Sequence, residues 1–337
     1  MKVYEIQDFG IDNLVQVGRE TPKAGPGQVV IKVKAASLNY RDLMTVTGRY
    51  NPKMALPRVP LSDGAGEVVE VGEGVTRVKV GDRVAACFMP KWVDGSVTPE
   101  IAKSALGGAV DGTLAQYIAI DAEGSVHIPN HLSFEEAATL PCAAVTAWNA
   151  LVEVGKLKAG DTVLVQGTGG VSIFALQFAK VFGARVIATS SSNEKLERVR
   201  ALGADETINY KETPDWDRRV LEITDKKGVD HVVEVGGAGT LDRSINSIRF
   251  GGGTIGVIGV LAGRSGEINT GAMLMKGVRV QGIFVGSRKM FEDMNRAIKV
   301  NKMKPVIDRV FSFGEARESL KYMESGAHFG KIVIRFE

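Results

Sequence analysis

An apolar stretch that runs directly into a glycine-rich turn is the feature that most constrains the fold of this chain. Val163–Gln166 has the composition of a buried strand, Gly167–Gly170 follows it, and a helical pattern begins at Val171. Such a unit typically binds the pyrophosphate of a dinucleotide, because the glycines let the backbone approach the phosphates and the helix N-terminus supplies free N–H groups. Ser172 replaces the third glycine of the pattern, but a small residue still permits close packing of helix on strand. The competing interpretation is an ordinary tight turn.

The sequence beyond this turn alternates between strand-like and helix-like segments. We expect helices over 171–182 and 193–202, the second with a capping box formed by Ser191 and Glu194 and a stop at Gly203. Strands separated by helices imply a doubly wound parallel sheet. The expected strands are 162–166, 185–189, 206–209, 230–235, 254–260 and 279–285.

The first part of the chain has a different pattern. Residues 1 to about 128 contain short alternating segments separated by glycine-rich turns, which predicts a partly open β-barrel. We expect the segment 134–154 to be helical with a break at Pro141, and the tail from about 290 to add one helix. The expected strands are 29–33, 66–71, 83–87, 111–117 and 331–336, with an irregular excursion over 89–112.

Size, charge and cysteine content limit the class of protein. The 337 residues suggest two domains, and the net charge of +3 argues against a nucleic-acid partner. No apolar stretch is long enough to span a membrane and no signal peptide is evident, so we expect a cytoplasmic protein. Cys87 and Cys142 are too few for an all-cysteine zinc site, and reduced thiols are favoured over a disulfide.

The end of the second strand of the parallel sheet should decide which nucleotide binds. An NAD site has a carboxylate there that accepts hydrogen bonds from the ribose 2′-OH. This chain has Ser190, then Ser191, with Lys195 about one helical turn further on. Hydroxyls and a lysine suit a 2′-phosphate and therefore favour NADPH, with Tyr210 able to reach the adenosine ribose. Glu194 opposes this interpretation, and the serines could instead only cap the helix.

With these residues in view, the chain resembles the medium-chain dehydrogenase/reductase superfamily along nearly its full length. It is most similar to the zinc-lacking branch of quinone oxidoreductases and enoyl or enone reductases. The resemblance implies a GroES-like catalytic domain built from 1–128 and 290–337, with a Rossmann NADP-binding domain over 129–289 between them. The matching segments are Ser37–Asp42, Pro60–Gly66, Val80–Val84, Asp111–Tyr117, Gln166–Val171 and Gly330–Val333.

The same resemblance bears on zinc. Zinc-dependent relatives have a cysteine where this chain has Asn39, a His–Glu pair where it has Ser62–Asp63, and a cysteine where it has Cys142. One thiolate without a histidine cannot make a catalytic zinc site with three protein ligands, so we expect no metal. A weak site formed by Asp63 and Cys142 is the minor alternative.

Without a metal, hydride transfer needs a conjugated acceptor, so the sequence predicts NADPH-dependent reduction of a quinone or an α,β-unsaturated carbonyl. The candidate catalytic residues are Tyr40, Arg41, Asp42 and Tyr50, although Arg41 and Asp42 could form a structural ion pair and the tyrosines could simply pack. The alternatives are a zinc-free alcohol dehydrogenase and an NADPH-binding protein without turnover.

The resemblance also implies contacts with the cofactor and an oligomer. Relatives pair through edge strands of their Rossmann domains, so a homodimer or homotetramer is expected. The expected cofactor contacts are Asn39, Thr146, Gly167, Thr168, Gly169, Gly170, Val171, Ser190, Ser191, Lys195, Tyr210, Gly259, Val260, Phe284, Val285 and Lys331.

Overall fold

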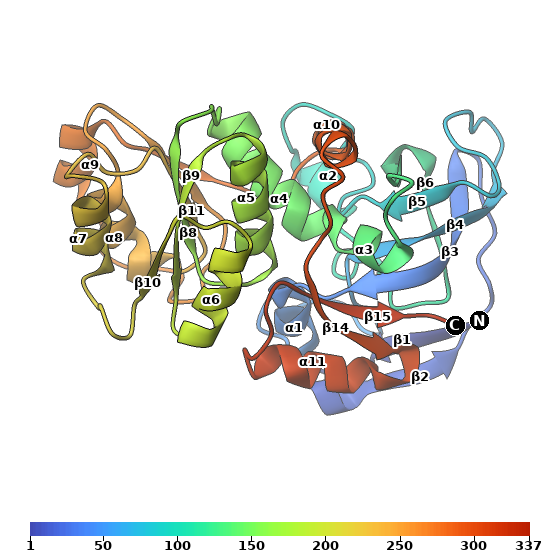
Figure 1. Ribbon diagram of the computed structural model, residues 1–337. Coiled ribbons are helices and arrows are strands. Elements are labelled where there is room, and N and C mark those ends of the chain that lie inside the picture. The colour runs from blue at the N-terminus through green and yellow to red at the C-terminus, as the bar shows by residue number, and fades with distance from the viewer. The chain divides into compact units, whose positions relative to one another are not determined.

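The computed structural model describes all residues from Met1 to Glu337, and they form two compact units (Figure 1). Unit 1 combines Met1–Val145 with Gly286–Glu337, and unit 2 is Thr146–Val285. Unit 1 therefore takes in residues 129–145, which we expected to open the second domain. The reason is that a short helix in this segment, α3 (Phe134–Ala138), packs on three strands of the unit 1 sheet.

The main sheet of unit 1 is largely antiparallel. Its order is β14-β15-β3-β4-β5-β7, and only the β14–β15 pair is parallel. The first half of β3 pairs with β6, whereas its last residues pair with β15. Ser37 at the end of β3 lies opposite both Asp63, the first residue of β4, and Val333 in the middle of β15, so the three strands are adjacent at this position. The strands are β3 (Gln28–Ser37), β4 (Asp63–Val71), β5 (Arg83–Ala86), β6 (Tyr117–Asp121), β7 (Ser125–His127), β14 (Ile307–Ser312) and β15 (Lys331–Arg335).

The remaining elements of unit 1 complete its apolar core. A two-stranded ribbon, β1 (Lys2–Ile6) and β2 (Leu14–Gly18), packs its buried residues with those of the main sheet. Alternate residues of β3, such as Ile31 and Val33, point into this core as a half-buried strand requires. The helices are α1 (Tyr40–Val46), α2 (Pro99–Ala102), α3 (Phe134–Ala138), α10 (Arg288–Val300) and α11 (Ala316–Glu324).

Unit 2 confirms the predicted doubly wound parallel sheet. Its strand order, β10-β9-β8-β11-β12-β13, reverses between β8 and β11, where dinucleotide-binding sheets of this type hold their ligand. Figure 1 shows α5 and α6 on one face of the sheet and α7 and α8 on the other. The strands are β8 (Thr162–Gln166), β9 (Arg185–Ser190), β10 (Glu206–Asn209), β11 (His231–Glu234), β12 (Thr254–Val257) and β13 (Arg279–Gly282).

The helices of unit 2 follow from apolar faces that the sheet covers. On α5, Phe174 and Phe178 are buried, and the Phe178 ring meets the Trp148 ring edge-on at 5.5 Å between centroids. The second core cluster packs Trp216 and Val220 of α7 with strands on the other side. The helices are α5 (Gly170–Val181), α6 (Asn193–Ala201), α7 (Trp216–Ile223), α8 (Ala238–Ser247) and α9 (Thr270–Lys276), while α4 (Val145–Trp148) begins at the unit boundary.

Several predicted boundaries need correction. The segment 111–116 is not a strand, because its residues form loop hydrogen bonds and the strand begins at Tyr117. The N-cap of α6 is Ser192, whose Oγ accepts from the Lys195 N–H at 3.3 Å, and not Ser191. The tail contains β14 and α11 besides the helix and strand that we expected.

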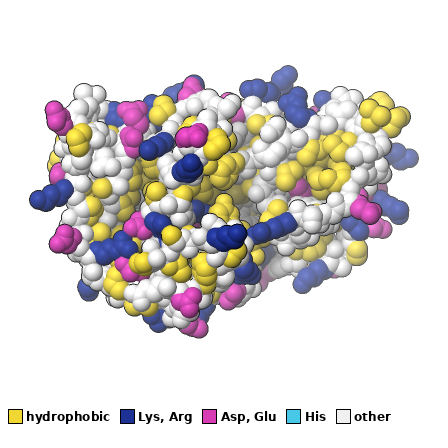
Figure 2. Space-filling model, turned by 180° about the vertical axis from the view of Figure 1, so that it is seen from behind, with side chains coloured by type: hydrophobic (Ala, Val, Ile, Leu, Met, Phe, Trp, Pro, Cys, Tyr) yellow, Lys and Arg dark blue, Asp and Glu magenta, His cyan; other side chains and the backbone are white.

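The surface carries charges of both signs. Figure 2 shows lysines and arginines interspersed with aspartates and glutamates over one face of the molecule, without a continuous basic area. This pattern agrees with the near balance of 42 basic and 39 acidic residues. None of the helices has the length and apolar content that crossing a bilayer requires.

Candidate active site

The glycine-rich turn has the geometry that a phosphate cradle requires. Gly167 has a φ of +70°, which a residue with a side chain rarely adopts, and Gly169 is the N-cap of α5. A methyl group built on either glycine would meet no atom within 4 Å, so the space above both is open. Ile173 donates its N–H to the Gly169 carbonyl, which leaves the N–H groups of the first turn pointing outwards. The residues present therefore fit a dinucleotide pyrophosphate.

Ser172 takes the third glycine position without disturbing this turn. Its side chain is buried, and its Oγ donates to the Gln166 carbonyl at 2.6 Å. The hydroxyl thus turns back onto the end of β8 and away from the open space. This contact explains why serine is compatible with the motif.

Glu234 is a structural centre of unit 2 that the sequence did not reveal. This fully buried carboxylate at the end of β11 accepts the Gly236 N–H at 2.8 Å and the Gly237 N–H at 3.0 Å. It also accepts the Thr240 hydroxyl at 2.6 Å and the Gln166 amide at 2.8 Å. Glu234 therefore links the loop after β11 to the end of β8, at the carboxyl edge of the sheet. A glutamate ending an apolar strand before Gly-Gly was the available sequence clue.

The end of β9 carries the predicted nucleotide-selecting residues. Ser190 is buried, and its Oγ accepts the Ser192 N–H at 3.3 Å. Ser191 is left without a capping role, because Ser192 caps α6. Tyr210 donates its N–H to the Ser190 carbonyl at 3.0 Å, and 41% of its surface is exposed. Lys195 lies in the first turn of α6, so all of these residues share one corner of unit 2.

The late strands of unit 2 lead into loops with constrained backbones. A methyl group at Gly259 would lie 2.2 Å from the Val235 carbonyl oxygen, so only glycine fits there. Val285 has a φ of +53°, a left-handed conformation that is rare for a β-branched residue. The buried Asn149 holds it by donating Nδ2–H to the Val285 carbonyl at 2.7 Å. Local strain of this kind is often concentrated at functional sites.

The other predicted contacts of unit 2 lie in varied environments. Thr146 is buried at 3% exposure, whereas Val260 and Phe284 are 39% and 40% exposed. Their contact with a cofactor stays a prediction. A separate hollow of unit 2, of about 370 Å³, lies at the opposite, amino-terminal edge of the sheet beside His231 and Thr254.

In unit 1 the structure brings together five polar residues that are distant in sequence. The Lys331 ammonium, at the start of β15, donates to the Asn39 Oδ1 at 2.6 Å and to the Leu38 carbonyl at 2.6 Å. Ser62 Oγ donates to Asp63 Oδ1 at 2.8 Å, and the Cys142 N–H donates to Asp63 Oδ2 at 3.1 Å. We call Asn39, Ser62, Asp63, Cys142 and Lys331 the polar cluster.

Burial dominates the electrostatics around this cluster. It raises the pKa of Asp63, while the Lys331 ammonium acts in the opposite direction. Burial likewise lowers the pKa of Lys331, and Asp63 is the first of the acids that oppose that effect. Burial also raises the pKa of the Cys142 thiol, to which Asp63 adds by repulsion. Cys142 is therefore a neutral thiol, and Cys87, whose pKa is raised to about 12 by burial, is another.

The residue before Ser62 has a strained backbone. Leu61 has a φ of +69°, and its carbonyl accepts the Thr113 N–H at 2.9 Å. A methyl group at Gly107 would lie 2.5 Å from the Leu61 oxygen, and one at Gly112 would lie 2.0 Å from it. Because Gly107 and Gly112 have no side chains, the Leu61 carbonyl has room for this conformation. The conformation directs the following residues, Ser62 and Asp63, into the polar cluster.

The candidate catalytic residues lie on and beside α1. Asp42 is fully buried, and its Oδ2 accepts the Asn39 N–H at 2.9 Å. Burial raises the pKa of Asp42 to about 6, against the opposing effect of Arg41. Arg41 donates to Asp42 at 3.3 Å and to the Leu106 carbonyl at 2.7 Å, and its guanidinium carbon lies 5.3 Å from the Tyr50 ring centroid. Tyr40 and Tyr50 remain 43% and 40% exposed.

These contacts show which candidates can touch a substrate. Arg41 and Asp42 form the ion pair that the sequence left open, and Asp42 has no exposed surface. The two tyrosines, in contrast, present large parts of their rings to solvent. Arg41 supports Tyr50 through a cation–π contact. The tyrosines are therefore the members of the group that can reach a ligand.

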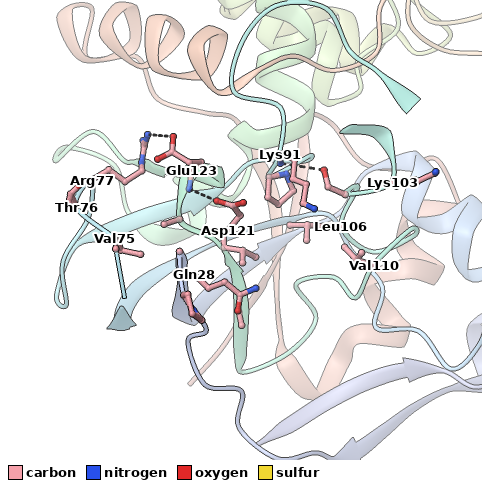
Figure 3. A pocket seen from close by; sticks show the side chains of 18 of the residues that line it. Gln28, Val75, Thr76, Arg77, Lys91, Lys103, Leu106, Val110, Asp121 and Glu123 are labelled. Carbon is pink, nitrogen blue, oxygen red and sulfur yellow. Dashed lines mark hydrogen bonds and ion pairs between the residues drawn. The ribbon is translucent and has the colours of Figure 1, made fainter. Parts of the chain in front are cut away.

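A separate pocket of unit 1, of about 650 Å³, contains none of the predicted site residues. Figure 3 shows Arg77 and Glu123, which form an ion pair at 3.7 Å, on one side and Lys91 and Lys103 on another. Asp121 adds to the negative charge in the lining. Because its lining carries both signs of charge without a clear pattern, we place the candidate site at the polar cluster and the exposed tyrosines.

Known proteins share the two-unit organisation of this chain. Residues 25–130 match the alcohol dehydrogenase GroES-like domain, and residues 170–300 match the zinc-binding dehydrogenase family. The zinc-type alcohol dehydrogenase-like protein C1773.06c of Schizosaccharomyces pombe is 47% identical, covering 97% of this chain and 96% of its own. The NADPH-dependent alkenal/one oxidoreductase of Arabidopsis thaliana chloroplasts is 31% identical, covering 99% and 79%. A solved NAD-dependent alcohol dehydrogenase aligns with a TM-score of 0.90 at 34% identity, covering 99% of both chains.

The fold and the family matches thus define an oxidoreductase with a GroES-like unit and a Rossmann-like unit, which confirms the predicted fold class. The chain belongs to the medium-chain dehydrogenase/reductase superfamily, as its sequence motifs predicted.

The family description raises the question of zinc, and the residues of the polar cluster do not fit it. Asn39 and Ser62 offer a neutral amide and a hydroxyl, and both oxygens of Asp63 accept hydrogen bonds from within the protein. A lysine ammonium stands beside them and would repel a cation. No group of three or more His, Cys, Asp or Glu side chains is placed to hold a metal ion.

Proposed function

We propose that this chain is an NADPH-dependent reductase of conjugated carbonyls, namely quinones or α,β-unsaturated ketones and aldehydes, and that it acts without zinc. The observation that carries the proposal is the Lys331 ammonium beside Asn39, where zinc-dependent relatives have a metal ligand. A site without a Lewis acid favours an acceptor whose negative charge is delocalised through conjugation. The similarity to an NADPH-dependent alkenal/one oxidoreductase supports the same substrate class.

In unit 2 the residues that would hold the cofactor follow from the geometry of the turn. The backbone of Gly167–Val171 would bind the pyrophosphate in the open space above the two glycines. Ser190, Ser191 and Lys195 would bind the 2′-phosphate, and Tyr210 would cover the ribose. Bound NADPH would supply a hydride.

In unit 1 the exposed tyrosines would serve the acceptor. A hydroxyl group of Tyr40 or Tyr50 would donate a hydrogen bond to the carbonyl oxygen, where negative charge develops as the conjugated carbon is reduced. Arg41, held by Asp42 and Leu106, would keep the Tyr50 ring in place through its cation–π contact. The proton that completes the reduction would come from the same tyrosine or from water.

A panel assay of NADPH oxidation tests this proposal. Quinones, enones, saturated ketones and simple alcohols with NADP would be compared, each with and without a chelator. We expect turnover with the conjugated acceptors alone and no effect of the chelator. Oxidation of alcohols that a chelator abolishes would contradict the proposal and favour the alcohol dehydrogenase activity of similar proteins. Tight NADPH binding without turnover on any acceptor would indicate a binding protein.

The choice of NADPH over NADH rests on the corner formed by Ser190, Ser191 and Lys195. Lys195→Glu should weaken NADPH binding at least about tenfold more than NADH binding, because it places a like charge beside the 2′-phosphate. Fluorescence titration of both nucleotides measures the two dissociation constants. Equal losses for the two nucleotides would refute the assignment.

We propose that the chain forms a homodimer or homotetramer through β13. This strand ends the six-stranded sheet, so its outer N–H and C=O groups have no partner strand. Just before it in the chain, Leu274 and Met275 of α9 are 81% and 68% exposed. Sedimentation analysis of Val280→Pro, which interrupts the edge, should show monomers where the unmodified chain sediments as an oligomer.

A further inference from the structure

Lys331 is an interior lysine, and its position is set by hydrogen bonds from within unit 1. Only 3% of the residue is exposed. Its ammonium donates to the Leu38 carbonyl and to the Asn39 Oδ1, each at 2.6 Å, and so spans from β15 to the residue before α1. Ser37 Oγ and the Leu38 N–H both donate to the Ile332 carbonyl at 3.0 Å, which fixes the backbones on either side of this link.

Buried acids on two other elements balance its charge. Asp63, on β4, and Asp42, on α1, have no exposed surface; Lys331 is the cation that faces both, and Arg41 is a second cation that faces Asp42. The Cys142 thiol also faces this group of charges. Removing one partner from such a set leaves an uncompensated buried charge, which is strongly unfavourable. The cluster therefore requires a cation at the position of the Lys331 ammonium.

The same ammonium sets the start of the helix that carries an exposed tyrosine. Asn39 is the N-cap of α1, and its N–H is held by the Asp42 carboxylate while its Oδ1 is held by Lys331. Tyr40, the next residue, is the first residue of α1. The direction in which Tyr40 leaves the protein interior thus depends on a residue that lies 291 positions later in the chain.

We propose that Lys331 is the resident cation of this site, in the place that a metal takes in zinc-dependent relatives, and that through Asn39 it is the positioning residue for Tyr40. The expected effect on kcat rests on the proposed reductase function, whereas the expected effect on the position of Tyr40 does not. It also differs from the sequence interpretation, in which Lys331 contacts the cofactor directly.

The kinetic test compares Lys331→Met and Lys331→Ala with Lys34→Met, a partly exposed lysine on β3 that serves as the control. We expect kcat with an enone to fall about 10–100-fold in both Lys331 variants, since a displacement of about 1 Å has that effect, with the dissociation constant of NADPH unchanged. Propylammonium should restore part of the kcat of Lys331→Ala, whereas tetramethylammonium at the same ionic strength should not. A larger dissociation constant for NADPH with an unchanged kcat would overturn the proposal and show that Lys331 contacts the cofactor.

A structural readout separates this inference from the proposed function. Incorporation of 3-fluorotyrosine, with the Tyr40 resonance assigned from Tyr40→Phe, reports on the environment of that ring by ¹⁹F NMR. In folded Lys331→Met the Tyr40 resonance should shift, whereas that of Tyr117 on β6 should stay in place. An unchanged Tyr40 resonance would overturn the proposal whatever the acceptor panel shows, and a shifted resonance in a chain that reduces no acceptor would overturn only the reductase function.

Discussion

The buried carboxyl group of Asp42 should make the stability of this protein depend on pH in a way that one substitution removes. Burial raises the pKa of Asp42 from its ordinary value of 3.8 to about 6. The folded state therefore holds the proton more tightly than the unfolded chain does, so the contribution to stability is complete below about pH 4 and is lost as the pH rises through 6. At about 1.4 kcal/mol per pKa unit, the loss amounts to about 3 kcal/mol.

Asp42→Asn abolishes this titration. The amide oxygen can still accept the Asn39 N–H, so the start of α1 keeps its hydrogen bond. We expect the difference in unfolding free energy between the unmodified chain and Asp42→Asn to shift by about 3 kcal/mol in favour of the variant between about pH 4 and pH 8. Asp8→Asn, at an exposed position, provides the control.

Urea unfolding monitored by tryptophan fluorescence at several pH values measures these free energies. The three tryptophans of the chain provide the signal. If the curves of the unmodified chain and Asp42→Asn stay parallel over the whole range, the carboxyl group does not titrate between these values, and the argument from burial fails.

Two further predictions concern backbone geometry. Gly169→Ala should leave the midpoint of thermal unfolding unchanged, because the added methyl group meets no atom within 4 Å. The same methyl group fills the space for the phosphates, so nucleotide titration should show NADPH binding weakened at least about tenfold. Gly18→Ala, which also places a methyl group in open space, is the control in both measurements. Lys302→Gly should raise the unfolding free energy by up to about 1 kcal/mol, since Lys302 has a φ of +48° just after α10. Lys299→Gly, inside α10, should lower it by about the same amount. If urea unfolding shows both substitutions changing the unfolding free energy in the same direction, this reasoning is wrong.

The parts of the fold that depend on short-range pattern were predictable from the sequence. The strand Thr162–Gln166 encloses the apolar run 163–165, and the strand Glu206–Asn209 lies between the glycine at 203 and the turn that begins at Tyr210, so both were found at the predicted bounds. The glycines at 167 and 169 likewise announced the turn, because Gly167 has a positive φ and because a side chain at either position would fill the space above the turn.

The polar cluster was only partly predictable. The resemblance pointed to Asn39, Ser62 and Asp63 as positions that zinc-dependent relatives use, but it could not show what fills the site instead. Lys331 begins an apolar strand, where a lysine is usually expected at the edge with its ammonium in water. Its burial follows from the pairing of β15 with β3, a contact between the two ends of the chain that no local pattern encodes.

Interior acids were hardest to recognise. Glu234 ends the four-residue strand β11, and on composition alone it is indistinguishable from a solvated residue at a strand end. Its role depends on hydrogen-bond donors from β8 and α8 that reach it only in the folded sheet. Recognising this residue needs three-dimensional information, because Gln166, which joins Glu234 to β8, lies 68 positions earlier in the sequence.

The left-handed Leu61 has a consequence for how this chain can vary in evolution. Side chains at positions 107 and 112 would collide with the Leu61 carbonyl, while any other conformation at position 61 would redirect the segment that carries Ser62 and Asp63. The three positions are therefore mutually dependent, although the two glycines lie more than 40 residues further along the chain than Leu61. Substitutions at position 107 or 112 should persist in descendants only when position 61 changes with them, so among diverged copies these sites should covary.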